Sequence, residues 1–240
     1  MEKAKTLFKW ILVVFALGLI SSCASSFRSQ PDKSNPIVTV AILPFSNLSN
    51  NADAPEHLRG LLSNKLTAKF YKVIPLQQVD ERLVDELGIT LGEQLSELEF
   101  EEIHSIINAD AYVYGDILHY DQITSGILNI NRVSTKLKMI QSRNEMIFWS
   151  SNIGIKSEVR SSGLSGSLAS LVSLGNDIND TEIHWITLRR EAGGDGSIVS
   201  NLIGGLLVKT LSSAFGLTLK FESMALINRS TMTLRNGPGF

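Results

Sequence analysis

An almost unbroken apolar run from Ile37 to Leu43 constrains the fold of this chain more than any other sequence feature. β-branched residues dominate the run and Pro44 ends it, which is typical of a short strand. A strand that is apolar at nearly every position must be covered on both of its faces. The run therefore predicts a central strand between two layers, and we expect Val40 and Ile42 to be buried.

The residues after this strand predict a crossover unit. Pro55 and Glu56 suit the first turn of a helix. A second strand is predicted over residues 71–76, and the order strand, helix, strand favours parallel pairing of the two strands. The apolar residues of the predicted helix recur at helical spacing: Leu58, Leu61, Leu62, Leu66 and Phe70.

Further elements extend the same sheet. Residues 79–87 predict a short helix that ends at Gly88, and residues 112–118 predict a strand. Alternation of apolar and polar residues over 131–140 predicts a strand with one wet face, and residues 146–149 predict its hairpin partner. We expect an α/β (α+β) fold, with a mixed β-sheet and flanking helices, over residues 37–157.

The composition shifts after residue 157, so we expect residues 158–240 to form a C-terminal extension. A strand is predicted over 182–190, and residues 221–234 lack a regular pattern. Residues 198–215 predict a helix that is apolar almost all round, which needs cover on two sides. Leu207 and Leu211 lie one turn apart on this helix and form the predicted interaction surface of a homo-oligomer. Alternatively, the Leu-rich segment 164–174 folds back over the helix in a monomer.

The N-terminal residues predict a secretory signal peptide over 1–22. Lys3, Lys5 and Lys9 precede a short apolar run, which is too short for an ordinary membrane-spanning helix. The sequence Ile-Ser-Ser-Cys that ends at Cys23 resembles the bacterial lipobox. That resemblance implies a mature chain that starts at lipidated Cys23, and Ala24 then favours the outer membrane. Residues 23–36 are Ser- and Pro-rich and predict a flexible tether.

Charge and residue types exclude several functions. Residues 1–22 hold three Lys and one Glu, so 19 basic and 23 acidic residues remain and the net charge is −4, unlike a nucleic-acid binder. Cys23 is the only cysteine, and no pair of histidines has the spacing of a metal site. Asp116 and Asp121 flank His119, but a strand scatters them across its faces. We expect no catalytic residues, metal or cofactor.

Several short motifs occur in a characteristic order: Val40-Ala-Ile-Leu-Pro-Phe45, Phe70-Tyr-Lys-Val-Ile-Pro75, Ile107-Asn-Ala-Asp-Ala-Tyr-Val-Tyr114, and a closing Asn236-Gly-Pro238. In this order they resemble a lipoprotein family typified by a conserved meningococcal surface antigen. That family is similar to the N-terminal domain of TolB and, more remotely, to CsgG. The resemblance implies a TolB-like domain in an envelope component, with no catalytic residues to carry over.

We therefore expect a non-enzymatic lipoprotein, anchored in the outer membrane by its N-terminal lipid and facing the periplasm. Its expected partners are other envelope proteins, within a transport or envelope-assembly system. An activator of peptidoglycan synthesis is one variant of this hypothesis. A subunit of a CsgG-like export channel and a periplasmic hydrolase are the alternatives.

Overall fold

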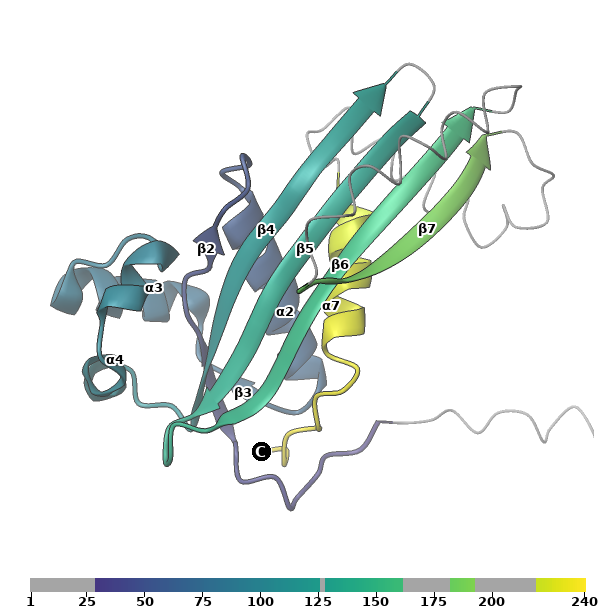
Figure 1. The fold of residues 1–240 in the computed structure, drawn as a ribbon. Coiled ribbons are helices and arrows are strands. Elements are labelled where there is room, and N and C mark those ends of the chain that lie inside the picture. Colours follow the sequence, from purple (N-terminus) through teal and green to yellow (C-terminus); the bar gives the residue numbers. More distant parts are fainter. Residues whose placement is uncertain (1–28, 126–127, 162–181, 193–218) are drawn as a thin grey trace, which may run out of the picture. The chain divides into compact units, whose positions relative to one another are not determined.

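One sheet organises the computed structural model, which describes residues 29–125, 128–161, 182–192 and 219–240 (Figure 1). The chain divides into two compact units, Met1–Gln30 and Pro31–Phe240, and every contact given below lies within the second. The strand order is β3-β1-β4-β5-β6-β7, and β2 pairs with β4 outside this path. The strands are β1 Thr39–Ile42, β2 Ser46–Asn47, β3 Lys72–Val73, β4 Ala111–Ser125, β5 Leu128–Gln141, β6 Ile147–Ser161 and β7 His184–Ala192.

Strand β1 is central, as the apolar run predicts. It pairs in parallel with β3 on one side and with β4 on the other. Val40 and Ile42 belong to one hydrophobic cluster, whereas Ala41 and Leu43 belong to a second, and all four are fully buried. Alternate side chains of a strand point to opposite faces, so both faces of β1 are covered. The predictions of a doubly covered strand and of buried Val40 and Ile42 are confirmed.

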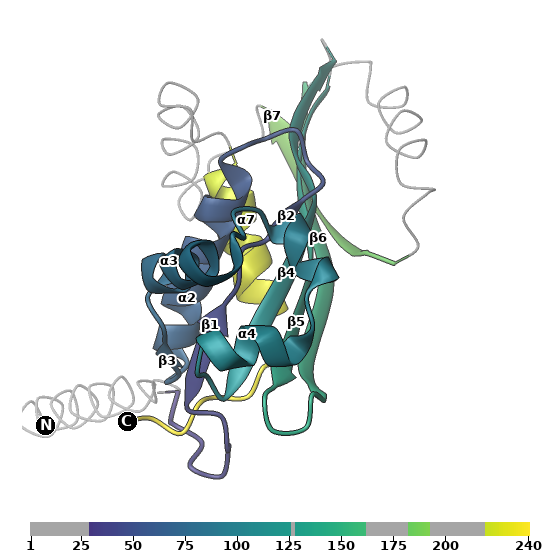
Figure 2. The same cartoon turned by 90° about the vertical axis from the view of Figure 1, so that its left-hand side faces the viewer.

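The helices divide between these two clusters. Helix α2 (Ala54–Ala68) follows the predicted helical spacing and buries Leu58, Leu62 and Leu66 in the first cluster. Helix α7 (Lys220–Ser230) joins it there, and Figure 2 shows α2 and α7 on the same side of β4, β5 and β6. Helix α3 (Leu76–Leu87), the 3₁₀ helix η2 (Gly92–Glu97) and helix α4 (Phe100–Ile106) contribute to the second cluster.

Strands β4, β5 and β6 form a long antiparallel meander, and β5 shows the alternation predicted for residues 131–140. Val133, Leu137 and Met139 are buried against the first cluster, whereas Lys138 is exposed on the other face. Ser134 differs, because it lies on the face predicted to be wet and is nevertheless fully buried. Its Oγ lies 2.8 Å from Nδ1 of His119.

The predicted domain boundary at residue 157 is not present in the structure. Strand β6 continues through it to Ser161, and β7 pairs with β6 in parallel. Residues predicted to be irregular form α7, which buries Glu222, Ser223 and Ser230 beside Leu226 and Ile227. These buried polar residues hide the apolar period on which helix prediction depends. The predicted helix 198–215, with Leu207 and Leu211, and the segment 164–174 lie outside the described residues.

The predicted tether ends earlier than expected. Asp32 N–H donates to the Gly237 carbonyl (2.8 Å), and Asn35 Nδ2 donates to the Asn236 carbonyl (2.9 Å) and the Tyr71 hydroxyl (3.0 Å). Asn35 is only 3% exposed. We call the contacts of residues 234–239 with residues 32–35 and 69–71 the C-terminal clasp. The clasp fixes residues 32–36 to the domain, whereas the signal peptide and Cys23 lie outside the described residues.

Replacing Gly237 by alanine is expected to lower the free energy of unfolding by about 1–3 kcal/mol, the usual effect of overpacking. A Cβ atom there would lie 2.5 Å from the Phe70 carbonyl oxygen and 2.7 Å from its carbonyl carbon. Both are backbone atoms, so relief requires the clasp to move. Urea unfolding followed by tryptophan fluorescence measures the loss.

Gly60 supplies the matched control. It lies inside α2, where a Cβ atom would have no neighbour within 4 Å. Alanine is the better helix former by about 1 kcal/mol, so Gly60→Ala should stabilise the protein. Unchanged stability in Gly237→Ala would show that the clasp does not restrain the domain.

Candidate functional site

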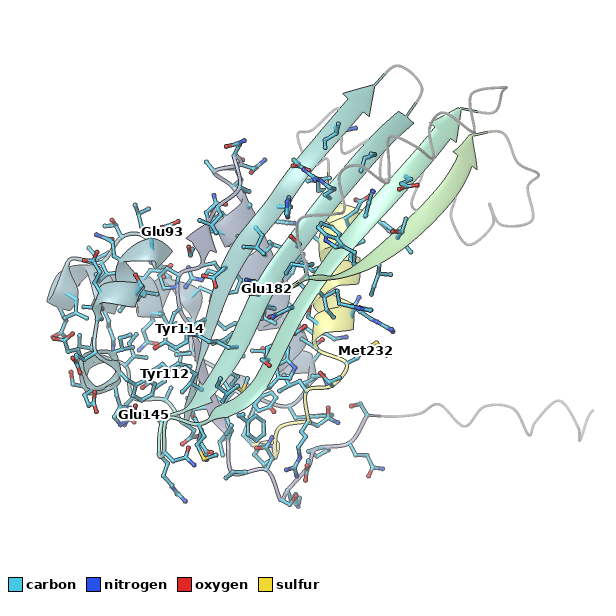
Figure 3. All side chains as sticks on the ribbon, viewed as in Figure 1. Glu93, Tyr112, Tyr114, Glu145, Glu182 and Met232 are labelled. Carbon is cyan, nitrogen blue, oxygen red and sulfur yellow. The ribbon has the colours of Figure 1, made fainter. Side chains whose placement is uncertain are left out.

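A groove of about 770 Å³ lies beside the sheet. Its wall is the segment from η2 to the start of α4, and its floor is the face of β4, β5 and β6 that points away from α7. We call it the sheet groove. Figure 3 shows Glu93, Tyr114 and Glu145, three residues of the lining, one after another along the sheet groove. Apolar lining residues include Pro44, Leu95, Leu98, Phe100, Tyr114, Ile140 and Ile147.

Close backbone contacts fix the wall. A Cβ atom on Gly92 would lie 2.2 Å from the carbonyl carbon of Phe45, so only glycine permits this approach of η2 to β2. The Glu93 carboxylate accepts a hydrogen bond from the Asn47 N–H (2.6 Å). Leu95 is buried in the second hydrophobic cluster and holds η2 from beneath. The wall is therefore part of the folded domain.

The middle of the floor is charged and aromatic. The Lys138 Nζ atom lies 5.0 Å from the centroid of the Tyr114 ring, within cation–π range. Desolvation raises the pKa of the Tyr114 hydroxyl to about 12, and electrostatic interaction with Tyr112 and Glu145 raises it as well. The phenol is therefore neutral at physiological pH, and it can donate or accept a hydrogen bond.

The two ends of the floor differ in polarity. Toward the β5–β6 turn, Ile140 pairs across the strands with Ile147, which is 63% exposed. In the opposite direction, Lys136 forms an ion pair with Glu182 and stands across from Asp116 on β4. Exposed large apolar side chains next to organised charges are typical of a surface that binds another molecule.

The residues singled out in the sequence are not brought together at this groove. Cys23, Leu207 and Leu211 lie outside the described residues. His119 contacts Ser134 and the Trp185 ring, with ring centroids 5.4 Å apart, whereas Asp121 forms an ion pair with Arg132. Within the described ranges, no group of three or more His, Cys, Asp or Glu residues could hold a metal ion.

Sequence reasoning missed the sheet groove because its wall and floor come from distant segments. One signal was available, namely the wet face predicted for residues 131–140, which supplies Lys136, Lys138 and Ile140. The role of Gly92 in fixing the wall had no local signature. None of the helices in the described part of the chain is long and apolar enough to cross a membrane.

Comparison with known proteins places the chain in a family of lipoproteins. The family described as "Putative lipoprotein GNA1162-like" matches residues 28–182, more than half of the chain, and the chain belongs to it. This finding confirms the resemblance that the ordered motifs indicate. Over 178 residues the chain is 25% identical to "Putative lipoprotein NMB1124/NMB1162" of Neisseria meningitidis serogroup B, covering 71% of this chain and 82% of that protein.

Two solved structures are similar over part of the chain. Lipoprotein GNA1162 from Neisseria meningitidis is 24% identical, with a TM-score of 0.47, and the match covers 57% of this chain and 94% of that one. The C-terminal domain of LpoB from Salmonella enterica is 19% identical, with a TM-score of 0.30, covering 55% of this chain and 88% of that domain.

Proposed function

We propose that this chain is a non-enzymatic, lipid-anchored envelope protein that binds another envelope protein through the sheet groove. Its membership of a lipoprotein family supports the anchor, which we assign to Cys23 at the outer membrane, with the domain facing the periplasm. The observation that carries the binding role is the groove itself. It combines a fixed wall, an exposed apolar end at Ile147 and an organised charged floor.

The chemistry of the groove favours binding over catalysis. Its described lining contains no histidine or cysteine. Lys136 is ion-paired with Glu182, and Glu93 is bound by the Asn47 N–H. Groups held in this way orient a partner rather than transfer protons. The identity of the partner protein will show in which transport or assembly system this chain acts. The crosslinking experiment below identifies that partner.

A photoreactive amino acid at position 147 is expected to trap a specific partner in native envelopes. Ile147 lies at the apolar end of the groove and is 63% exposed. The same amino acid at position 232 is the control, because Met232 is 66% exposed and follows α7, which packs on the other face of the sheet. Irradiation, electrophoresis and mass spectrometry identify the adduct.

The proposed function predicts a discrete adduct from position 147 and none of that mass from position 232. A discrete adduct from position 232 alone would contradict the groove as the binding site. Equal adducts from both positions would indicate contact that is not specific to the groove.

A further inference from the structure

The two lysines on the floor of the sheet groove differ in whether they have a counter-ion. Lys136 has its counter-ion in Glu182, with Asp116 opposite it on β4. Lys138 is exposed, and its Nζ atom lies over the Tyr114 ring. Over the described ranges, no carboxylate lies within ion-pair distance of the Lys138 ammonium. The groove therefore presents one cation that is positioned by an aromatic ring but not neutralised.

An apolar site lies next to this cation. Ile140 is on the same face of β5 as Lys138, and Ile147 stands opposite Ile140 on β6. Same-face neighbours on a strand are about 7 Å apart, twice the rise per residue. An extended segment presents its own alternate side chains at the same spacing. Two residues of such a segment, with one residue between them, can therefore contact the isoleucine pair and the Lys138 ammonium respectively.

Among the described residues, the carboxylates that line the groove are those of Glu93, Asp116 and Glu145, and none of them forms an ion pair with the Lys138 ammonium. Glu93 accepts a hydrogen bond from Asn47, and Asp116 stands opposite Lys136. Glu145 lies in the β5–β6 turn, from which its charge also acts on the Tyr114 hydroxyl. A ligand that supplies a carboxylate at Lys138 therefore complements a cation of the groove that has no counter-ion among the described residues.

We propose that the sheet groove recognises an acidic–apolar peptide segment of its partner, with a carboxylate at Lys138 and a large apolar side chain against Ile140 and Ile147. This inference rests on the proposed function and specifies the chemistry of the partner. The Tyr114 ring holds the ammonium in place, and its neutral hydroxyl is available as a second donor to the carboxylate.

Short fluorescent peptides, capped at both ends, test this inference with the full-length lipidated protein in detergent micelles. The first peptide carries a glutamate two residues after a phenylalanine, and the others carry glutamine or lysine in place of the glutamate. Fluorescence anisotropy measures their affinities. The glutamate peptide is expected to bind at least about tenfold more tightly than the lysine peptide, because like charges in contact oppose binding strongly.

Variants of Lys138 show whether this preference arises at the proposed position. Lys138→Glu should reverse the preference, and Lys138→Arg should preserve it. Lys72→Glu makes the same charge change at an exposed residue of β3, outside the sheet groove, and should leave the preference unchanged. Absence of peptide binding, equal affinity for the three peptides, or an unaltered preference in Lys138→Glu would each overturn the inference.

The two proposals fail separately. A discrete adduct from position 147 together with no preference among the peptides would retain the groove as a binding site and reject acidic recognition. Absence of an adduct from position 147, with a discrete adduct from position 232, would reject the proposed function and this inference with it.

Discussion

Replacing Ile42 by alanine is expected to lower the free energy of unfolding by about 2–5 kcal/mol, the usual range for truncating a buried isoleucine. Ile42 is fully buried in β1, which lies between β3 and β4. Its side chain belongs to the hydrophobic cluster that α2 and α7 share with the sheet. The neighbouring strands and helices limit collapse around the cavity, so most of the lost packing is not recovered.

The backbone of Ile42 makes this substitution a test of packing. The Arg59 guanidinium donates to the Ile42 carbonyl at 2.9 Å and also forms an ion pair with Asp80. Alanine keeps that carbonyl, so the bond is preserved. Urea unfolding followed by the fluorescence of Trp149, which is only 6% exposed, measures the change.

Ile147→Ala provides the control for the same chemical change. Ile147 is 63% exposed, so its truncation should alter the free energy of unfolding by less than about 0.5 kcal/mol. A similar small change in Ile42→Ala would mean that β1 contributes little to the core. Such a result would contradict both the apolar-run argument and the observed burial.

The N-terminal half of the fold follows from local sequence patterns because its elements obey simple periodicities. The apolar run at Ile37–Leu43 has no polar face, and only a doubly covered strand accommodates it. The spacing of Leu58, Leu62 and Leu66 defines the buried stripe of α2. Gly88 has φ +68° after α3, a conformation that glycine adopts readily and that ends the helix where predicted.

The C-terminal part was predicted less well, and α7 shows the physical reason. Its buried side includes Glu222, whose carboxylate accepts a hydrogen bond from Asn131 Nδ2 at 2.9 Å. Its exposed side includes Phe221 and Met224, which are 36% and 46% exposed. A polar group buried with a specific partner breaks the link between hydrophobicity and burial, so the helix has no clear apolar period.

The clasp and the groove depend on contacts between residues far apart in the sequence. Asn35 and Asn236 are short polar residues that locally indicate a turn or linker. Their bond becomes possible only after the sheet has brought the two ends of the domain together. The groove depends in the same way on the approach of Gly92 to β2 and on the β4–β6 floor. Local alternation predicts the solvent-exposed face of β5, whereas the opposing wall of the groove depends on tertiary contacts.

Replacing Cys23 by serine is expected to abolish lipidation and to leave the protein uncut or soluble in the periplasm. The lipobox resemblance implies that the Cys23 thiol takes a diacylglyceryl group before the signal peptide is removed. A serine hydroxyl supplies no thiol, and Cys23 is the only cysteine of the chain. Metabolic labelling with palmitate and fractionation of the envelope measure the two consequences.

The size of the effect follows from the energetics of acyl chains in a bilayer. Each buried CH₂ group contributes about 0.8 kcal/mol, and stable anchoring usually needs more than one chain. Loss of the diacylglyceryl group removes at least two chains, so membrane association should disappear rather than weaken. Ser25→Ala, which keeps Cys23, should remain labelled and membrane-bound. The Cys23→Ser protein has no cysteine thiol. Palmitate label that still enters this variant would therefore show that the lipid is attached to another group, and it would contradict the assignment of the anchor to Cys23.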